Sequence, residues 1–115
     1  MSINKRVEDR LVPLEVVVVR DESSNAEVGR VLDYSVNGFM LSTHLKLKNE
    51  EEYRYSFSLK NGDSFEKLLT FRTQCRWKRL DPSTGLMIAG FKILHRGEDK
   101  IALIKALIHR NSKEN

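Results

Sequence analysis

The chain has few of the residues that form covalent crosslinks or metal sites. Its 115 residues include one cysteine and three histidines. A single cysteine, Cys75, cannot form an internal disulfide bond. The histidines do not share the spacing of a structural zinc site either. We therefore expect neither a bound metal nor a cofactor.

Long hydrophobic runs and catalytic motifs are also absent. Apolar runs such as Val16–Val19 are far shorter than the roughly 20 residues of a membrane-spanning helix. The N-terminus has no apolar stretch of the kind found in signal peptides. The motifs G-x-S-x-G, H-E-x-x-H, G-x-G-x-x-G and the P-loop do not occur. We expect a cytoplasmic protein that does not insert into a membrane and is not an enzyme.

Periodic hydrophobic patterns predict a β-rich fold. Alternating or β-branched segments predict six strands near residues 12–20, 27–32, 38–42, 51–59, 69–78 and 86–94. Between the fourth and fifth strands, Asn61-Gly62 predicts a type I′ hairpin turn. The apolar residues of 98–110 repeat with a helical period, with acidic residues at the start and Arg110 at the end. The expected fold is all-β with one helix: a six-stranded antiparallel β-barrel followed by a C-terminal α-helix.

The domain organisation follows from the same patterns. Residues 1–11 are polar, mixed in charge and without period, which predicts a flexible N-terminal arm. We expect residues 12–110 to form one barrel domain with its helix and residues 111–115 to form a frayed tail.

Two short polar motifs are the candidate ligand site. Arg6 and Arg10 form an R-x-x-x-R pair in the arm, with Lys5 beside them. Guanidinium groups bind phosphate and the O6/N7 edge of guanine in a bidentate manner. Taken alone, the pair is more typical of a solvated basic terminus that Glu8 and Asp9 partly neutralise, because R-x-x-x-R often occurs by chance.

The second motif, D-x-S-x-x-G, consists of Asp33, Ser35 and Gly38 in a predicted turn between two strands. Asp and Ser cap tight turns through backbone hydrogen bonds, and glycine adopts conformations closed to other residues. Those roles alone explain the motif. A carboxylate at this place also suits the N1–H and N2 amino group of guanine.

Together, in this order, the two motifs resemble those of the PilZ family of cyclic di-GMP receptors. The resemblance extends to a late strand with Trp77 and to Ala89-Gly90-Phe91 in the last strand. It implies a six-stranded barrel with a C-terminal helix, in which Arg6 and Arg10 grip guanine edges and phosphates. Asp33, Ser35 and Gly38 would line the other side of the ligand. One departure is the acidic pair Glu8-Asp9 between the arginines, where family members often carry neutral or basic residues.

Two further features have competing interpretations. Trp77 lies on the apolar face of its predicted strand, which favours a core role, although the indole could instead stack on a base. The basic residues of the fifth strand could contact nucleic acid or an acidic partner, or form its solvated face: Arg72, Arg76, Lys78 and Arg79. The sequence has few aromatic residues to stack on bases, so we expect no DNA or RNA partner.

The main hypothesis is a bacterial receptor in which cyclic di-GMP orders the N-terminal arm and thereby alters the surface that an unknown downstream protein recognises. The alternative is a degenerate PilZ-like interaction module that does not bind the dinucleotide.

Overall fold

A computed structural model describes residues 11–13, 15–35 and 37–94 of the chain. Its strands are β1 (Val17–Asp21), β2 (Glu27–Tyr34), β3 (Gly38–Thr43), β4 (Glu52–Asn61), β5 (Ser64–Asp81) and β6 (Leu86–Ile93). All six predicted strands are present, although the first begins at Val17 rather than at residue 12. No helix occurs in the described ranges. The predicted helix at 98–110, the tail 111–115 and residues 1–10 of the predicted arm lie outside them.

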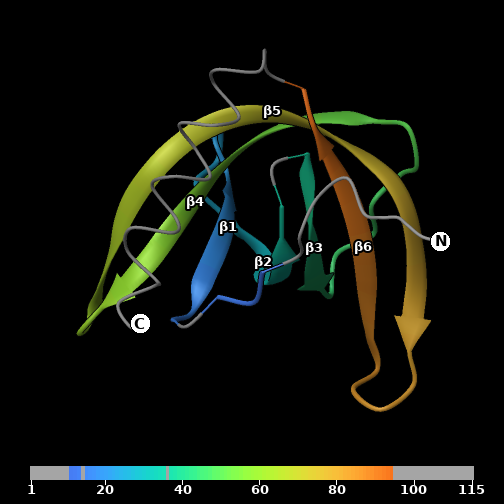
Figure 1. Cartoon of the computed structure of the whole chain (residues 1–115), viewed down its shortest axis with the longest axis horizontal. Helices are drawn as coiled ribbons and strands as arrows, with labels where there is room; N and C mark the ends of the chain where they lie inside the picture. The colour runs from blue at the N-terminus through green and yellow to red at the C-terminus, as the bar shows by residue number, and fades with distance from the viewer. Residues whose placement is uncertain (1–10, 14, 36, 95–115) are drawn as a thin grey trace, which may run out of the picture.

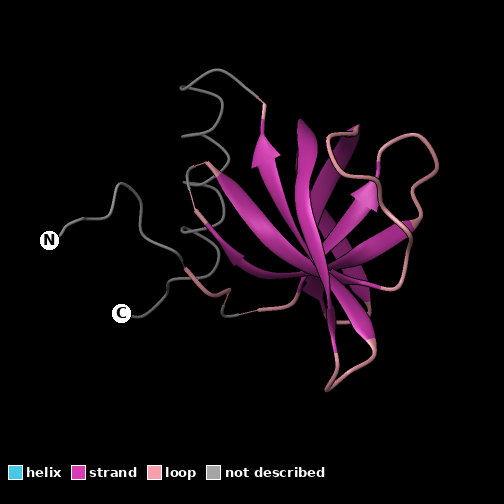
Figure 2. Cartoon of the chain, turned by 90° about the vertical axis from the view of Figure 1, so that its right-hand side faces the viewer, coloured by secondary structure: helices cyan, strands magenta, loops and turns pink. Residues whose placement is uncertain are grey.

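The strands form one closed antiparallel barrel in the order β1-β2-β3-β6-β5-β4. β5 is 18 residues long and arches over the other strands (Figure 1). Its first part pairs with β4 and its last part with β6. Figure 2 shows the strands crossing one another around a shared interior. One long, strongly bent strand therefore joins the two halves of the barrel.

Aromatic side chains fill the barrel interior around Phe39. The Phe39 ring stacks on that of Phe91, with centroids 5.1 Å apart and planes at 2°. The Phe57 and Phe71 rings meet Phe39 edge-on, at centroid distances of 5.1 and 5.7 Å. Such pairs add about 0.5–1.5 kcal/mol each beyond the burial of their area. The rings come from β3, β4, β5 and β6, so they hold together strands that are distant in sequence.

Both faces of β1 are covered. Val17 and Val19 belong to the interior cluster. Val18 points to the opposite face and yet is only 3% exposed. This agrees with the β-branched run in the sequence, in which both alternating sets of positions are apolar.

A β-bulge changes the expected face of Leu32. Val31 pairs with Leu41 and Asp33 pairs with Met40, so Leu32 is the extra residue in β2. An extra residue shifts the alternation of side chains by one position. A second extra residue, Val28, lies between Gly29, which pairs with Val19, and Glu27, which pairs with Arg20. Because of this second bulge, Val28 and Val31 are both buried, and Leu32, the residue after Val31, is 36% exposed. Unbroken alternation would instead place Leu32 on the same face as Val28.

The β4–β5 hairpin turns one residue later than the sequence predicts. Asn61 pairs with Ser64, so the two-residue loop is Gly62-Asp63 rather than Asn61-Gly62. Gly62 has φ of 65°. Glycine at the first central position is typical of a type II′ turn, which matches the twist of the strands as a type I′ turn does.

Candidate functional site

The D-x-S-x-x-G motif forms the end of the β2–β3 hairpin. Asp33 lies in β2 and pairs with Met40 of β3, so it belongs to the strand rather than to the turn as predicted. The Ser35 amide donates to the Gly38 carbonyl at 2.8 Å. The Ser35 hydroxyl, in a side chain only 1% exposed, accepts a bond from the Asn37 amide at 3.3 Å. It also lies 3.5 Å from the Gly38 carbonyl oxygen. Ser35 therefore shapes the turn from within, while Asp33 is half-buried on the strand.

Gly38 is required for a different reason from the one expected. Its φ is not in the positive range, in contrast to those of Gly62 and Gly85. A Cβ atom at position 38 would lie 2.1 Å from the carbonyl oxygen of Phe91 on β6. Glycine here permits two strand backbones to approach closely. The prediction of a special backbone conformation was wrong.

The last residue of the predicted arm is bound to this hairpin. The Leu11 amide donates to the Tyr34 carbonyl at 2.8 Å, and the Tyr34 amide donates to the Leu11 carbonyl at 2.9 Å. Tyr34 is 2% exposed, and its burial raises the pKa of its phenol. Tyr34 stands between Asp33 and Ser35, so the chain enters the barrel beside both motif residues. Lys5, Arg6 and Arg10 lie outside the described residues.

Strand pairing connects Asp33 with Trp77. Asp33 pairs with Met40, Met40 pairs with Gly90, and Gly90 pairs with Trp77. These four positions form one row across β2, β3, β6 and β5. Paired residues of neighbouring strands point to the same face of a sheet. Asp33 and Trp77 therefore lie on the same outer face, about three strand spacings, roughly 14 Å, apart.

Trp77 is not a core residue, contrary to the more favoured prediction from its alternation. A bulge between Cys75 and Trp77 shifts the register. Cys75 therefore stays inside while Trp77 is 38% exposed. The indole lies over Gly90, where a Cβ atom would come within 2.2 Å of Nε1. The Arg79 guanidinium lies 5.9 Å from the ring centroid, within the range of cation–π attraction.

A small hollow separates Trp77 from β3. Its volume is about 200 Å³, and its lining includes Met40, Arg76, Trp77 and Gly90. Sequence reasoning missed Met40 and Gly90 as parts of this face. The motif Ala89-Gly90-Phe91 was the available signal, but the indole that covers the glycine comes from another strand.

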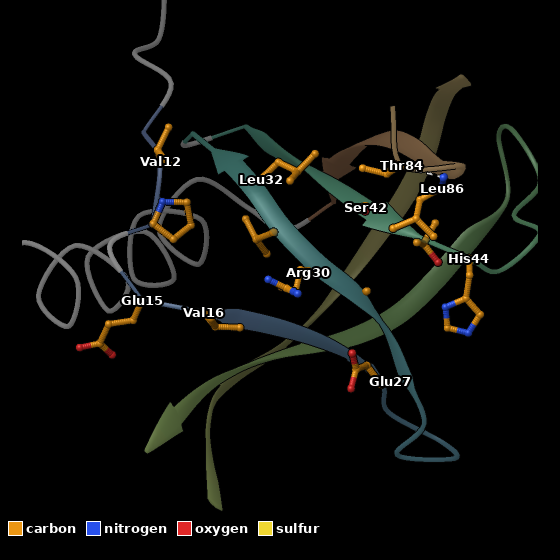
Figure 3. A pocket seen from close by; sticks show the side chains of 14 residues that line it. Val12, Glu15, Val16, Glu27, Arg30, Leu32, Ser42, His44, Thr84 and Leu86 are labelled. Atoms are coloured by element: carbon orange, nitrogen blue, oxygen red, sulfur yellow. Dashed lines mark hydrogen bonds between the residues drawn. The ribbon is translucent and has the colours of Figure 1, made fainter. Parts of the chain in front are cut away.

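A larger hollow lies on the outer face of β2 (Figure 3). Its volume is about 590 Å³. Its walls come from the segment before β1, from β2 and β3, and from the β5–β6 hairpin: Val12, Pro13, Glu15, Val16, Glu27, Gly29, Arg30, Val31, Leu32, Ser42, Thr43, His44, Thr84 and Leu86. Its charged lining consists of one cation, Arg30, and two carboxylates, Glu15 and Glu27, so its charge does not favour an anionic ligand. The hollow extends to Leu32, the sequence neighbour of Asp33. No pattern in the sequence predicted this hollow.

Carboxylates partly neutralise the basic row of β5. Arg72 pairs with Glu52 at 3.1 Å, and Arg76 pairs with Glu50 at 3.4 Å. The ammonium of Lys78 donates to the Leu47 carbonyl, and Arg79 lies over Trp77. A nucleic-acid surface presents its cations to phosphates, whereas these four have contacts within the chain.

Other classes of site receive no support from the described part of the chain. It holds no group of three or more His, Cys, Asp or Glu residues placed to bind a metal ion. Among the same residues, no helix has the length and apolar character needed to cross a membrane.

Comparisons with known proteins agree with this fold. The model of the PilZ domain matches residues 4–110. A search among curated proteins found no match. The structure is similar to that of the inhibitor of motility MotI/DgrA from Bacillus subtilis, with a TM-score of 0.67 and 17% identity over 94% of this chain and 52% of that one.

Two structures from Escherichia coli are also similar. YcgR in complex with cyclic di-GMP gives a TM-score of 0.64 and 14% identity, over 94% of this chain and 46% of YcgR. The PilZ domain of YcgR with cyclic di-GMP gives a TM-score of 0.55 and 15% identity, over 93% of this chain and 94% of that domain. The chain thus spans about half the length of MotI/DgrA and of full YcgR.

These similarities to solved structures show a shared fold, and the family match covers nearly all of the sequence. PilZ domains are non-catalytic receptor domains for cyclic di-GMP. The chain therefore belongs to the PilZ domain family.

Proposed function

We propose that this PilZ domain is a receptor for cyclic di-GMP and that the ligand fixes the N-terminal arm against the barrel. Arg6 and Arg10 would bind the phosphates and guanine edges from the arm, with Lys5 adding positive charge. Asp33 would accept hydrogen bonds from a guanine base on the barrel side. The altered arm would then change the surface that a downstream protein recognises.

The pairing of Leu11 with Tyr34 is the observation that carries this proposal. Consecutive Cα atoms are about 3.8 Å apart, so position 10 is one residue from the strand that contains Asp33. A guanidinium on a side chain of this length can reach a ligand held at Asp33. Under this proposal, two motifs separated by more than twenty residues of sequence would contact the same ligand.

The row from Asp33 to Trp77 supports a ligand that lies on the outer face of the barrel. Its two ends offer a carboxylate and an exposed indole, and the small hollow lined by Met40 and Trp77 lies between them. A purine could stack on Trp77, an interaction that contributes about 1–3 kcal/mol per base. Ser35 and Gly38 are buried, which favours a role in shaping the hairpin that presents Asp33.

Isothermal titration of the full chain with cyclic di-GMP at moderate salt tests the proposal. We expect saturable heat and a rise in melting temperature, since a ligand that binds only the folded state stabilises it. Cyclic di-AMP is the control ligand, because adenine lacks the O6 acceptor that arginine recognises in guanine. Absence of heat and of a thermal shift at saturating cyclic di-GMP would leave the ligand-independent interaction module as the function.

Substitutions locate the site. Arg10→Ala and Asp33→Ala each remove a charge-assisted hydrogen bond worth about 1.5–3 kcal/mol, which is roughly a ten- to hundredfold loss of affinity. Arg54→Ala and Asp63→Ala, at exposed positions of β4 and of its turn, are the matched controls and should bind normally. Normal affinity in both site variants would place the ligand elsewhere.

The arm has its own measurement. Trypsin cleaves after Lys5, Arg6 and Arg10, and bound ligand should slow this cleavage by covering those side chains. Tight binding without any protection would contradict the role of the arm.

A further inference from the structure

We propose that the groove between residues 44–47 and the ends of β5 and β6 binds an extended acidic segment of a partner protein. The groove has a volume of about 390 Å³ and is called the hairpin groove below. Its lining includes Leu45, Leu47, Lys78, Leu80 and Met87. Figure 1 shows the β5–β6 hairpin that forms one wall extending beyond the other strands.

The hairpin groove exposes apolar side chains from both walls. Leu80 is 58% exposed and Leu45 is 37% exposed. Single exposed leucines are ordinary on a protein surface, whereas apolar residues that converge on one hollow mark an interaction site. The volume suits a few side chains rather than a whole domain surface.

One wall is also a strand edge. Pairing of β5 with β4 ends at Gln74, and Cys75 makes the next backbone bonds, with residues 50 and 51. From Trp77 to Asp81, β5 pairs only with β6 among the described strands. A strand paired on one side can accept an extended peptide on the other, with side-chain pockets providing specificity.

The positive charge of the hairpin groove favours an acidic segment as its ligand. Its described lining includes Lys46 and Lys78 but no acidic residue. The nearby Asp81 carboxylate already accepts bonds from the Ser83 and Thr84 hydroxyls, at 2.9 and 3.1 Å. A second copy of the same edge would bring lysine against lysine. A segment that alternates apolar and acidic residues would place its apolar side chains beside Leu80 and its carboxylates near the lysines.

This surface does not depend on the proposed ligand. It lies at the far ends of β5 and β6 from the Asp33 hairpin, because Gly38 pairs with Lys92 while Leu80 pairs with Met87. Binding to the hairpin groove therefore succeeds or fails separately from binding of cyclic di-GMP.

Amide chemical-shift mapping on the isotopically labelled full chain tests the proposal. The probe is a short synthetic peptide that alternates glutamate and leucine, and the control probe replaces each glutamate with lysine. We expect saturable shifts at residues 44–47 and 78–81 with the acidic peptide only. No shifts at millimolar peptide, or equal shifts with the basic peptide, would overturn the proposal.

Variants assign any binding to the hairpin groove. Leu80→Ser and Lys46→Glu should each weaken it at least tenfold. Phe65→Ser and Lys60→Glu change matched residues at the opposite end of the barrel and should leave it unchanged. The high exposure of Leu80 means that its variant should fold, which the unperturbed remainder of the spectrum verifies. If the chain instead forms a dimer in sedimentation that Leu80→Ser dissociates, the occupant is a second copy and the proposed partner is wrong.

Discussion

The indole of Trp77 on β5 covers Gly90 on β6 so closely that a Cβ atom at position 90 would lie 2.2 Å from Nε1. No residue with a Cβ atom fits beneath the ring without moving it. Gly90 in turn pairs with Met40, the partner of Asp33. The position of the Trp77 indole relative to the Asp33 carboxylate therefore depends on the absence of a side chain at Gly90.

Replacing Gly90 by alanine should displace the indole of Trp77. Trp77 is the only tryptophan of the chain, so its fluorescence reports this movement directly. We expect a red-shifted emission maximum, because the displaced indole becomes more exposed to water. If Trp77 stacks on the ligand, Trp77→Ala should weaken cyclic di-GMP binding by about 1–3 kcal/mol. An unchanged spectrum in Gly90→Ala would contradict the packing.

Replacing Gly38 by alanine should destabilise the barrel. The new methyl group would meet the Phe91 carbonyl oxygen at 2.1 Å, and backbone cannot withdraw as a flexible side chain can. Forcing extra carbon into a packed region costs typically about 1–3 kcal/mol, which urea unfolding measures. Gly62→Asn is the control, because position 62 has free space around it and Asn tolerates positive φ. Equal stability of the Gly38→Ala variant and the wild type would refute the role assigned to this glycine.

Two buried tyrosines should make stability depend on alkaline pH. Burial is the largest cause that raises the pKa of both Tyr34 and Tyr55 above the ordinary value of 10.0. Above pH 10 the unfolded state loses phenolic protons that the folded state keeps, so the free energy of unfolding falls as pH rises. Below pH 10 both states keep these phenolic protons, so the two tyrosines do not make the free energy of unfolding depend on pH there.

Absorbance titration near 295 nm should show delayed ionisation of these phenols in the folded protein and normal ionisation in urea. Tyr55→Phe should remove part of the alkaline loss of stability. A folded-state titration identical to that in urea would show that the phenols are not buried.

Asp81 should stabilise the β5–β6 turn most strongly above its ordinary pKa. Its carboxylate accepts bonds from the Ser83 hydroxyl and amide and from the Thr84 hydroxyl, and the bonds with Ser83 are the main cause that lowers its pKa below 3.8. The stabilisation is therefore present at neutral pH and is lost as pH falls through the lowered value.

The melting temperature of Asp81→Ala should accordingly be lower than that of wild type at pH 7, and the difference should shrink in acid. Asp63→Ala, in the other long hairpin, is the control. A difference that stays constant down to pH 2 would show that the carboxylate charge has no part in this turn.

The sequence alone determined the six strands, their approximate bounds and the hairpins that join several of them. Alternating side chains decide which residues are buried over short distances, and turn residues act locally, so both are visible in a linear pattern. The D-x-S-x-x-G motif was visible for the same reason, because Asp33, Ser35 and Gly38 belong to one segment of six residues.

Only the tertiary structure decided on which face of the sheet the side chains of Leu32 and Trp77 lie. It also decided why positions 38 and 90 require glycine, and that the backbone of Leu11 pairs with that of Tyr34. Each bulge adds one residue to a strand and reverses the faces that alternation predicts. The close approach at Gly38 joins β3 and β6, which are far apart in sequence, and the one at Gly90 depends on the shifted register between β5 and β6. The shape of the outer face around Asp33 is therefore a product of barrel closure, which no local pattern records.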